Sequence, residues 1–319
     1  MAFKPFVTFN NGNCCPLLGL GTWNSKPGEV EQAIKDAIDI GYRHFDCAHI
    51  YLNEKEVGAA LNEKIKEGAV SRDGLFITSK VLLWNTFHKQ DQVVPALKKT
   101  LANLGLEYVD LYLIHWPMGF KEDGDLFPRD ENDKVLYSDT HYTETWRGME
   151  ECVKEGLTKS IGLSNFNSQQ IQEILDMASI KPVNVQVECH PYLNQTKLYK
   201  FCEANGITLT AYSPLGSPAR PGAKPDDLIL LKDPKLKELG DKYNKTPAQI
   251  LIRYQIERDI IVIPKSVNKE RIQSNFDSLS FTLSKDDMKI LDGLDRQDGR
   301  MLKLENIADH KDYPFSIEY

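Results

Sequence analysis

Four residues able to hold or transfer a proton stand at or just after the ends of short apolar runs. Asp46, Lys80 and His115 each end such a run, and Tyr51 follows Asp46 by five residues. An Asp and a Lys on neighbouring strands are costly to bury unless they pair, so we expect an ion pair that keeps the ammonium charged. That ammonium favours the anion of a nearby phenol, whose ordinary pKa is about 10, and helps Tyr51 to donate a proton. His115 can orient a carbonyl oxygen, so the set suits protonation of a developing alkoxide.

Other kinds of catalysis find less support in the sequence. No Ser or Cys has an evident base, and the histidines and cysteines form neither HExxH nor CxxC. We therefore expect no metal site and disfavour a metal-dependent hydrolase. A structural ion pair is the alternative for Asp46 and Lys80, and a core histidine or metal ligand is the alternative for His115. Their coincidence with Tyr51 favours the catalytic interpretation.

Eight short apolar runs are the strands that must position these side chains. They are too short for helices and too continuous for strands exposed on one face, which is typical of parallel strands buried on both faces. Amphipathic segments with helix start signals alternate with them, so the sequence predicts an α/β fold, a (β/α)8 TIM barrel forming one domain over 1–319. An Asn11-Gly12 turn predicts a β-hairpin before the first parallel strand. The predicted strands are 17–22, 43–47, 75–79, 109–114, 160–163, 183–187, 207–211 and 260–263.

Helix starts and long loops complete the predicted plan. Asn167 and Thr246 each precede a Gln by three residues, which predicts capping boxes. The segments 117–142, 213–233 and 295–319 exceed the bare repeat and follow strand ends or the barrel itself. Because loops after the carboxyl ends of barrel strands share the face that carries the active site, we expect these three segments to wall a substrate pocket.

Composition limits the partners. The 319 residues carry a formal net charge of −7, which argues against nucleic acid or an anionic membrane, since both attract Lys and Arg. The sequence has no run of 18 apolar residues and no signal-peptide pattern, so we expect a cytoplasmic protein with no membrane span. Six cysteines without paired spacing predict reduced thiols.

Three motifs occur in order along the chain. The first is Gly41-Tyr42-Arg43-His44-Phe45-Asp46-Cys47-Ala48 with Tyr51, Asn53-Glu54 and Val57-Gly58; the second is Lys159-Ser160-Ile161-Gly162-Leu163-Ser164-Asn165-Phe166; the third is Ile263-Pro264-Lys265-Ser266 followed by Arg271. Together they resemble the signatures of the aldo-keto reductases, close to the aldose and aldehyde reductase branch. The similarity runs from about Phe6 to the end of the chain.

The resemblance implies an NADPH-dependent reductase of aldehydes and ketones, usually monomeric, that acts on a small-molecule carbonyl compound. Asp46, Tyr51, Lys80 and His115 match the catalytic tetrad, with Tyr51 as general acid. Residues matching the cofactor site are Gly21, Thr22, Trp23, Ser164, Asn165, Gln186, Tyr212, Ser213, Leu215, Ser217, Lys265, Ser266, Asn268, Arg271 and Asn275. Residues expected to line the substrate pocket are Trp23, Trp84, Trp116, Phe120 and Leu302.

Cofactor choice depends on a basic cluster. Lys265, Ser266, Asn268 and Arg271 match the family's site for the adenosine 2′-phosphate, which favours NADPH over NADH. Two cations and a hydroxyl suit a dianion, although a solvated helix start is the alternative. Two features depart from the family pattern: three residues separate Lys80 from Trp84, two more than usual, and Ser274 replaces an acidic residue, so Asn275 is expected near the adenine.

The sequence is also compatible with a function other than reduction. A barrel of this kind could bind the cofactor and serve as a structural or regulatory partner of another protein. Loss of a tetrad residue would favour that alternative, and none is lost. The sequence leaves the physiological substrate open among sugars, lipid aldehydes, xenobiotic carbonyls and steroid-like ketones.

Overall fold

The predicted apolar runs form one closed sheet of eight parallel strands in the computed structural model, which describes residues 5–81, 89–122, 128–224, 227–317 and 319. The strands follow the chain in the order β10-β9-β8-β7-β6-β5-β4-β3. Parallel bridges from Leu18 to Val262 and from Gly21 to Lys265 join the two edges and close the barrel. The strands are β3 (Leu20–Gly21), β4 (His44–Asp46), β5 (Phe76–Val81), β6 (Leu111–Ile114), β7 (Ile161–Ser164), β8 (Asn184–Glu188), β9 (Thr208–Tyr212) and β10 (Ile261–Val262).

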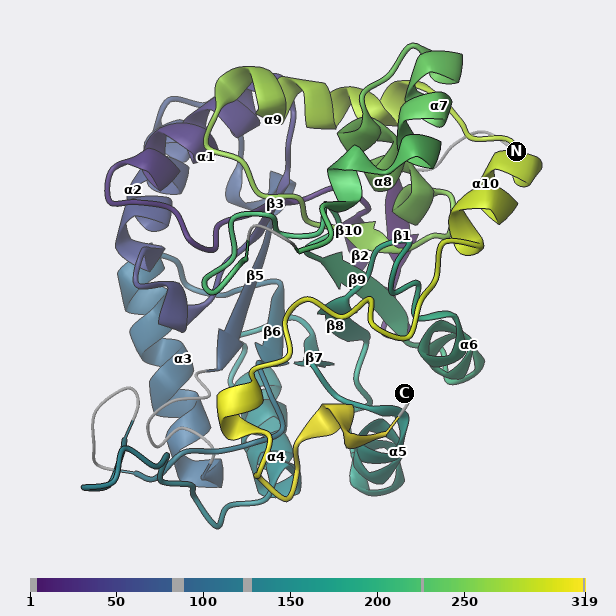
Figure 1. Cartoon of the computed structure of the whole chain (residues 1–319). Helices are drawn as coiled ribbons and strands as arrows, with labels where there is room; N and C mark the ends of the chain where they lie inside the picture. Colours follow the sequence, from purple (N-terminus) through teal and green to yellow (C-terminus); the bar gives the residue numbers. More distant parts are fainter. Residues whose placement is uncertain (1–4, 82–88, 123–127, 225–226, 318) are drawn as a thin grey trace.

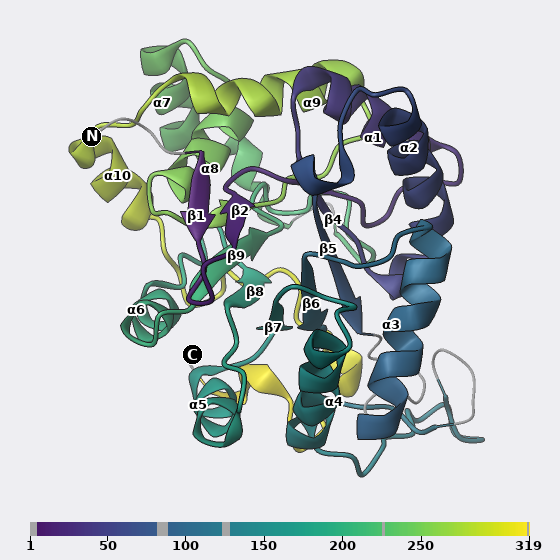
Figure 2. The same cartoon turned by 180° about the vertical axis from the view of Figure 1, so that it is seen from behind.

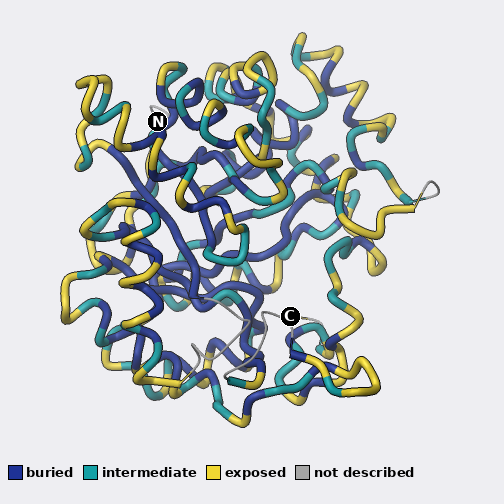
Figure 3. The backbone as a smooth tube through the Cα atoms, turned by 90° about the vertical axis from the view of Figure 1, so that its left-hand side faces the viewer, coloured by how far each residue is buried: buried dark blue, intermediate teal, exposed yellow. Residues whose placement is uncertain are grey.

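Helices surround the barrel, and the strands lie inside (Figure 1). Figure 3 shows the buried strands in dark blue and the exposed backbone on the periphery, as expected when amphipathic helices cover strands that are apolar on both faces. The predicted α/β barrel is therefore confirmed. The helices are α1 (Glu29–Ile40), α2 (Glu54–Lys66), α3 (Gln90–Leu104), α4 (Tyr142–Lys154), α5 (Ser168–Met177), α6 (Thr196–Ala204), α7 (Pro234–Tyr243), α8 (Pro247–Ile256), α9 (Lys269–Phe276) and α10 (Lys285–Asp292).

The predicted helix starts have their capping contacts. Asn167 begins α5 with a complete capping box, in which its side chain accepts from the backbone N–H of Gln170. Thr246 begins α8 in the same way, with Pro247 in the first turn. Each cap satisfies N–H groups that have no partner inside the helix, so the sequence signal and the observed helix ends agree.

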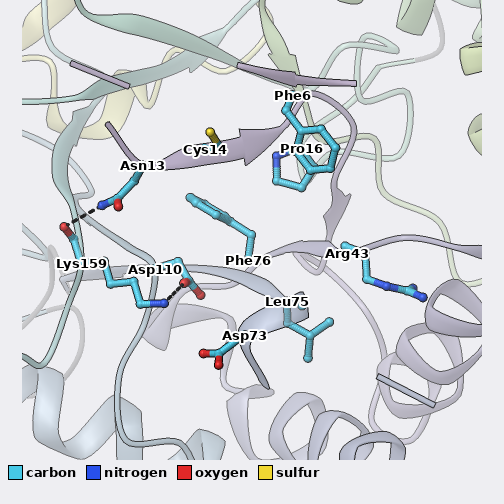
Figure 4. Close-up of a pocket in the computed structure, with 11 residues that line it drawn as sticks. Phe6, Asn13, Cys14, Pro16, Arg43, Asp73, Leu75, Phe76, Asp110 and Lys159 are labelled. Carbon is cyan, nitrogen blue, oxygen red and sulfur yellow. Dashed lines mark hydrogen bonds and ion pairs between the residues drawn. The ribbon is translucent and has the colours of Figure 1, made fainter. Parts of the chain in front are cut away.

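The amino-terminal hairpin covers the end of the barrel where the strands begin. β1 (Phe6–Thr8) pairs with β2 (Cys14–Pro16), and Figure 2 shows the pair in front of the strand starts. A pocket lies beside it, lined by Cys14, Arg43, Asp110 and Lys159 among others (Figure 4). The polar groups there contact one another: Lys159 Nζ lies 3.4 Å from Asp110 Oδ1, and its carbonyl accepts from an Asn13 side chain.

The long loops and the carboxyl-terminal tail lie at the opposite end. In Figure 1 the yellow tail after α10 crosses in front of the carboxyl ends of the strands. One strand runs further than expected: β5 extends to Val81, so Lys80 lies within the strand and not beyond it. All six cysteines are free. Among the residues that the structure describes, no helix is long and apolar enough to cross a membrane.

Candidate active site

The structure brings the Asp46 carboxylate and the Lys80 ammonium together at the barrel mouth. Asp46 ends β4, Lys80 lies on the neighbouring β5, and Lys80 Nζ is 2.5 Å from Asp46 Oδ1. The ammonium also donates to the Cys47 carbonyl at 2.9 Å. Burial opposes the charge of Lys80, but Asp46 and Tyr51 outweigh burial and hold the pKa of Lys80 above its ordinary value. The ammonium is therefore fixed and charged.

Tyr51 lies above this ion pair on a short 3-10 helix, His49–Tyr51, that follows β4. Lys80 Nζ is 3.4 Å from the Tyr51 hydroxyl and 5.2 Å from its ring centre. Burial raises the pKa of Tyr51 to about 12, although Lys80 lowers it. The net direction is opposite to the one expected from the ammonium alone, because a phenolate loses more hydration at this site than one cation returns. Tyr51 is consequently protonated at neutral pH.

His115 approaches Tyr51 from the end of β6. The two rings meet edge to face, with their centres 6.0 Å apart and their planes at 77°. Burial and, secondarily, the Lys80 ammonium place the pKa of His115 well below its ordinary value. The imidazole is therefore neutral near pH 7, with one N–H to donate. Its Nδ1 is buried and has no hydrogen-bond partner among the described residues.

A second group of polar side chains surrounds the mouth from β7, β8 and β9. Gln186 donates to Asp46 Oδ2 at 2.8 Å, and Tyr212 donates its hydroxyl hydrogen to Asn165 Oδ1 at 2.7 Å. The Asn165 amide in turn donates to the His115 carbonyl and to the Ser164 hydroxyl. These side chains thus form two hydrogen-bonded groups at the mouth, one on Asp46 and one on Asn165.

The residues expected at the mouth of the first strand lie at or just after the end of β3, and those expected along the cofactor's diphosphate follow β9. After β3, Thr22 is buried and donates to the Asp46 carbonyl at 2.9 Å, while Trp23 is half-buried. After β9, the Ser213 and Ser217 hydroxyls are 2.7 Å apart. Both serines have positive φ, 48° and 41°, so the backbone turns tightly there. Gly21 and Leu215 lie half-buried in the same two segments.

The basic cluster lies at the start of α9. Lys265 and Arg271 are exposed, while the Asn268 side chain caps the helix by accepting from the Arg271 N–H at 2.9 Å. Ser266 accepts from the Asn268 N–H at 3.1 Å, and Asn275 is buried on the same helix. Partial burial and the Arg271 charge lower the pKa of Lys265. Two cations held close enough to repel each other are suited to an anion between them.

An apolar cluster borders the mouth where the loop after β6 meets the tail. Trp116 packs edge to face on Phe315 with ring centres 5.5 Å apart, and Phe120 is buried beside Tyr137. Leu302 is half-buried on the tail. Trp84 lies outside the described residues. The buried members of this cluster are Trp116, Met118, Phe120, Val135 and Ile307.

Sequence reasoning missed Glu188, which lies two residues beyond Gln186 on β8. Side chains two apart on a strand point to the same side, so this spacing was the signal that could have found it. Within the described residues, no group of three or more His, Cys, Asp or Glu side chains could hold a metal ion.

Comparison with known proteins agrees with this geometry. Residues 17–296 match the sequence profile of the Aldo/keto reductase family. The chain is 48% identical over 324 residues to "Aldo-keto reductase family 1 member A1" of Mus musculus, and equally to that of Homo sapiens, covering 98% of this chain and of each relative. A solved structure, "Structure of the Aldose Reductase from Schistosoma japonicum", superimposes with a TM-score of 0.91 at 46% identity over 99% of this chain and 100% of that one. Profile, relatives and fold agree, and the chain belongs to the aldo/keto reductase family.

Proposed function

We propose that this protein reduces aldehydes and ketones to alcohols with NADPH, and that Tyr51 is the general acid. The observation that carries the proposal is the contact of a protonated phenol with a buried, charged ammonium 3.4 Å away and with the ring of a neutral histidine. The relatives named above are an aldo-keto reductase and an aldose reductase, which supports carbonyl reduction as the reaction class.

The residues present fit a nicotinamide dinucleotide phosphate. Tyr212, Asn165 and Gln186 would hold the nicotinamide beside Tyr51, and the 213–217 loop would follow the diphosphate. Lys265 and Arg271 would hold the 2′-phosphate, because a dianion would offset their mutual repulsion, which adds to burial in lowering the pKa of Lys265. When bound, NADPH supplies the hydride that the carbonyl carbon receives.

The tetrad would handle the proton. His115 donates a hydrogen bond to the carbonyl oxygen and orients it, and Tyr51 gives that oxygen its proton as negative charge develops. An alkoxide is a stronger base than a phenolate, so the transfer is favourable even from a phenol with a pKa of about 12. The resulting phenolate is stabilised by Lys80, whose charge Asp46 retains, until solvent returns the proton.

The proposal includes a preference for bulky or apolar carbonyl compounds over small charged ones. The apolar cluster that includes Trp116, the neighbour of His115 in the chain, supports this, because its partly buried members Leu304 and Phe315 keep some aromatic and aliphatic surface exposed. We extend the proposal to a monomer in the cytoplasm, which gel filtration and cell fractionation would test.

The direct test uses the purified chain. It is mixed with NADPH and a panel of aldehydes and ketones of graded size, and loss of the reduced-nicotinamide absorbance is followed. We expect turnover with several members of the panel and higher kcat/KM for the larger apolar ones. Absence of turnover across the panel, with NADPH binding intact, would refute the proposed reaction and favour a cofactor-binding partner protein.

A further inference from the structure

Glu188 is a fully buried carboxylate at the last position of β8, and the tetrad does not use it. Its two oxygens accept three hydrogen bonds. Oε1 accepts from the Met301 N–H at 2.8 Å and lies 2.9 Å from His190 Nε2, while Oε2 accepts from the Leu302 N–H at 3.0 Å. A buried carboxylate with three such partners is strongly held in one orientation.

The position of Glu188 links the tail to the residues of the mouth. Gln186 and Glu188 point to the same side of β8, and Gln186 already contacts Asp46. Glu188 is also the register partner of Tyr212 on β9. The carboxylate therefore lies one step further out than Gln186, between the tetrad and the tail.

His190 fixes the Glu188 carboxylate through its Nε2 contact with Oε1. His190 is fully buried, as is Glu188. Burial raises the pKa of Glu188, but the hydrogen bonds from His190, Met301 and Leu302 outweigh burial and lower it. Glu188 is consequently ionised, so both backbone N–H groups face an anion, which strengthens each bond.

The loop after β8 also holds the start of the tail. The Arg296 N–H donates to the Tyr192 carbonyl at 3.2 Å, and the Asn194 N–H donates to Asp295 Oδ1 at 2.8 Å. A Cβ on Gly299 would lie 1.7 Å from the Tyr192 carbonyl oxygen, so the backbones there approach too closely for any other residue. The tail thus reaches Glu188 along one fixed path.

We propose that Glu188, oriented by His190, is a positioning residue that fixes residues 301–304 across the substrate pocket and so sets the KM of bulky carbonyl substrates. The inference rests on the proposed function, because it assigns Leu302 to the wall of that pocket. The tail donates to Glu188 through two backbone N–H groups. Glu188 therefore fixes the position of residues 301–304 whatever side chains they carry.

The substitution Glu188→Gln tests this with little change of shape. A glutamine can accept from one of the two N–H groups but must turn its NH2 toward the other. Glu150→Gln is the matched control: Glu150 is a buried carboxylate that accepts from two consecutive N–H groups before β8, those of Ser179 and Ile180, at 2.7 and 2.8 Å, and neither partner belongs to the tail.

We expect Glu188→Gln to raise the KM of bulky carbonyl compounds about tenfold, the loss of one bond to a charged acceptor, with kcat for the smallest substrates and the Kd for NADPH unchanged. Hydrogen exchange should show faster exchange at Met301 and Leu302 in this variant only. Glu150→Gln should lower the Tm without changing the KM pattern.

Two results would overturn the inference. One is the same KM pattern in Glu188→Gln and Glu150→Gln. The other is an unchanged KM for bulky substrates in Glu188→Gln when the wild-type enzyme is active. If the wild-type chain reduces no carbonyl compound, the proposed function fails. Hydrogen exchange at Met301 and Leu302 then still decides whether Glu188 holds the tail.

Discussion

Gln186 donates a hydrogen bond of 2.8 Å to Oδ2 of Asp46 from a strand four places away in the closed sheet. The other oxygen of Asp46 accepts from Lys80 at 2.5 Å. Both carboxylate oxygens are therefore fixed, one by each side of the barrel mouth. The position of the ammonium beneath Tyr51 depends on three strands at once, and this dependence can be tested one residue at a time.

Replacing Tyr51 by Phe removes the proposed proton donor and keeps the ring. We predict that kcat falls by about 10²–10⁴, the usual contribution of a general acid, while the Kd for NADPH changes little. Steady-state kinetics and fluorescence titration with NADPH measure the two quantities. Near-normal turnover in this variant would reject the role assigned to Tyr51.

Replacing Asp46 by Asn leaves the Lys80 ammonium buried without a countercharge. We predict a loss of about 3–5 kcal/mol in the free energy of unfolding, because a buried charge without its partner is strongly destabilising. Urea unfolding measures it. Asp110→Asn is a suitable control, since it removes a carboxylate paired with Arg72 at the other end of the barrel and should destabilise without lowering kcat. Equal stability of Asp46→Asn and wild type would contradict the prediction.

The low pKa of His115 predicts the pH profile of reduction. Its folded pKa lies well below the ordinary value of 6.5, so the imidazole stays neutral as the pH falls through that value. We therefore expect no loss of kcat/KM attributable to His115 near pH 6.5. A loss there that disappears in His115→Asn would show that His115 gains a proton near pH 6.5, which would contradict its low pKa.

The basic cluster predicts cofactor preference. Lys265→Ala combined with Arg271→Ala should raise the Kd for NADPH more than tenfold, since each charge-assisted bond contributes about 1.5–3 kcal/mol, and should change the Kd for NADH little. Lys269→Ala is the matched control on the same helix, where Lys269 pairs with Asp36 at 3.1 Å. Equal losses for both cofactors would place the 2′-phosphate elsewhere.

His44 predicts how stability changes with pH. It lies buried between the Pro16 carbonyl and the Thr78 hydroxyl, and burial lowers its pKa from 6.5 to about 4. Between these two pH values His44 is protonated in the unfolded chain but not in the folded chain. The free energy of unfolding therefore falls by about 3 kcal/mol in total as the pH drops from about 6.5 to about 4. Unfolding titrations of wild type and His44→Gln should show that this slope becomes shallower in the variant; an identical slope in both would exclude His44 as its source.

The strands were predictable because each is a short, largely apolar run buried on both faces, as in a sheet covered by helices all round. Asp46, Lys80 and His115 could be placed from strand ends alone, since the carboxyl ends of parallel strands meet at one face. The pKa of Tyr51 could not be predicted from the sequence, because it depends on how completely the surrounding loops exclude water. The spacing from Gln186 places Glu188 on the same side of β8 but does not indicate its contacts with the tail, because these come from backbone N–H groups more than a hundred residues away.

Three of the contacts that hold the tail are made through its peptide groups and not through its side chains. Glu188 accepts from the N–H groups of Met301 and Leu302, and any residue other than proline would donate in the same way. Near the other end of the tail, the Asn167 side chain donates to the Pro314 carbonyl. New side chains at Met301 and Leu302 therefore leave the two backbone hydrogen bonds to Glu188 in place. Under the proposed function, substrate preference could therefore change at these two positions while the tail stays anchored.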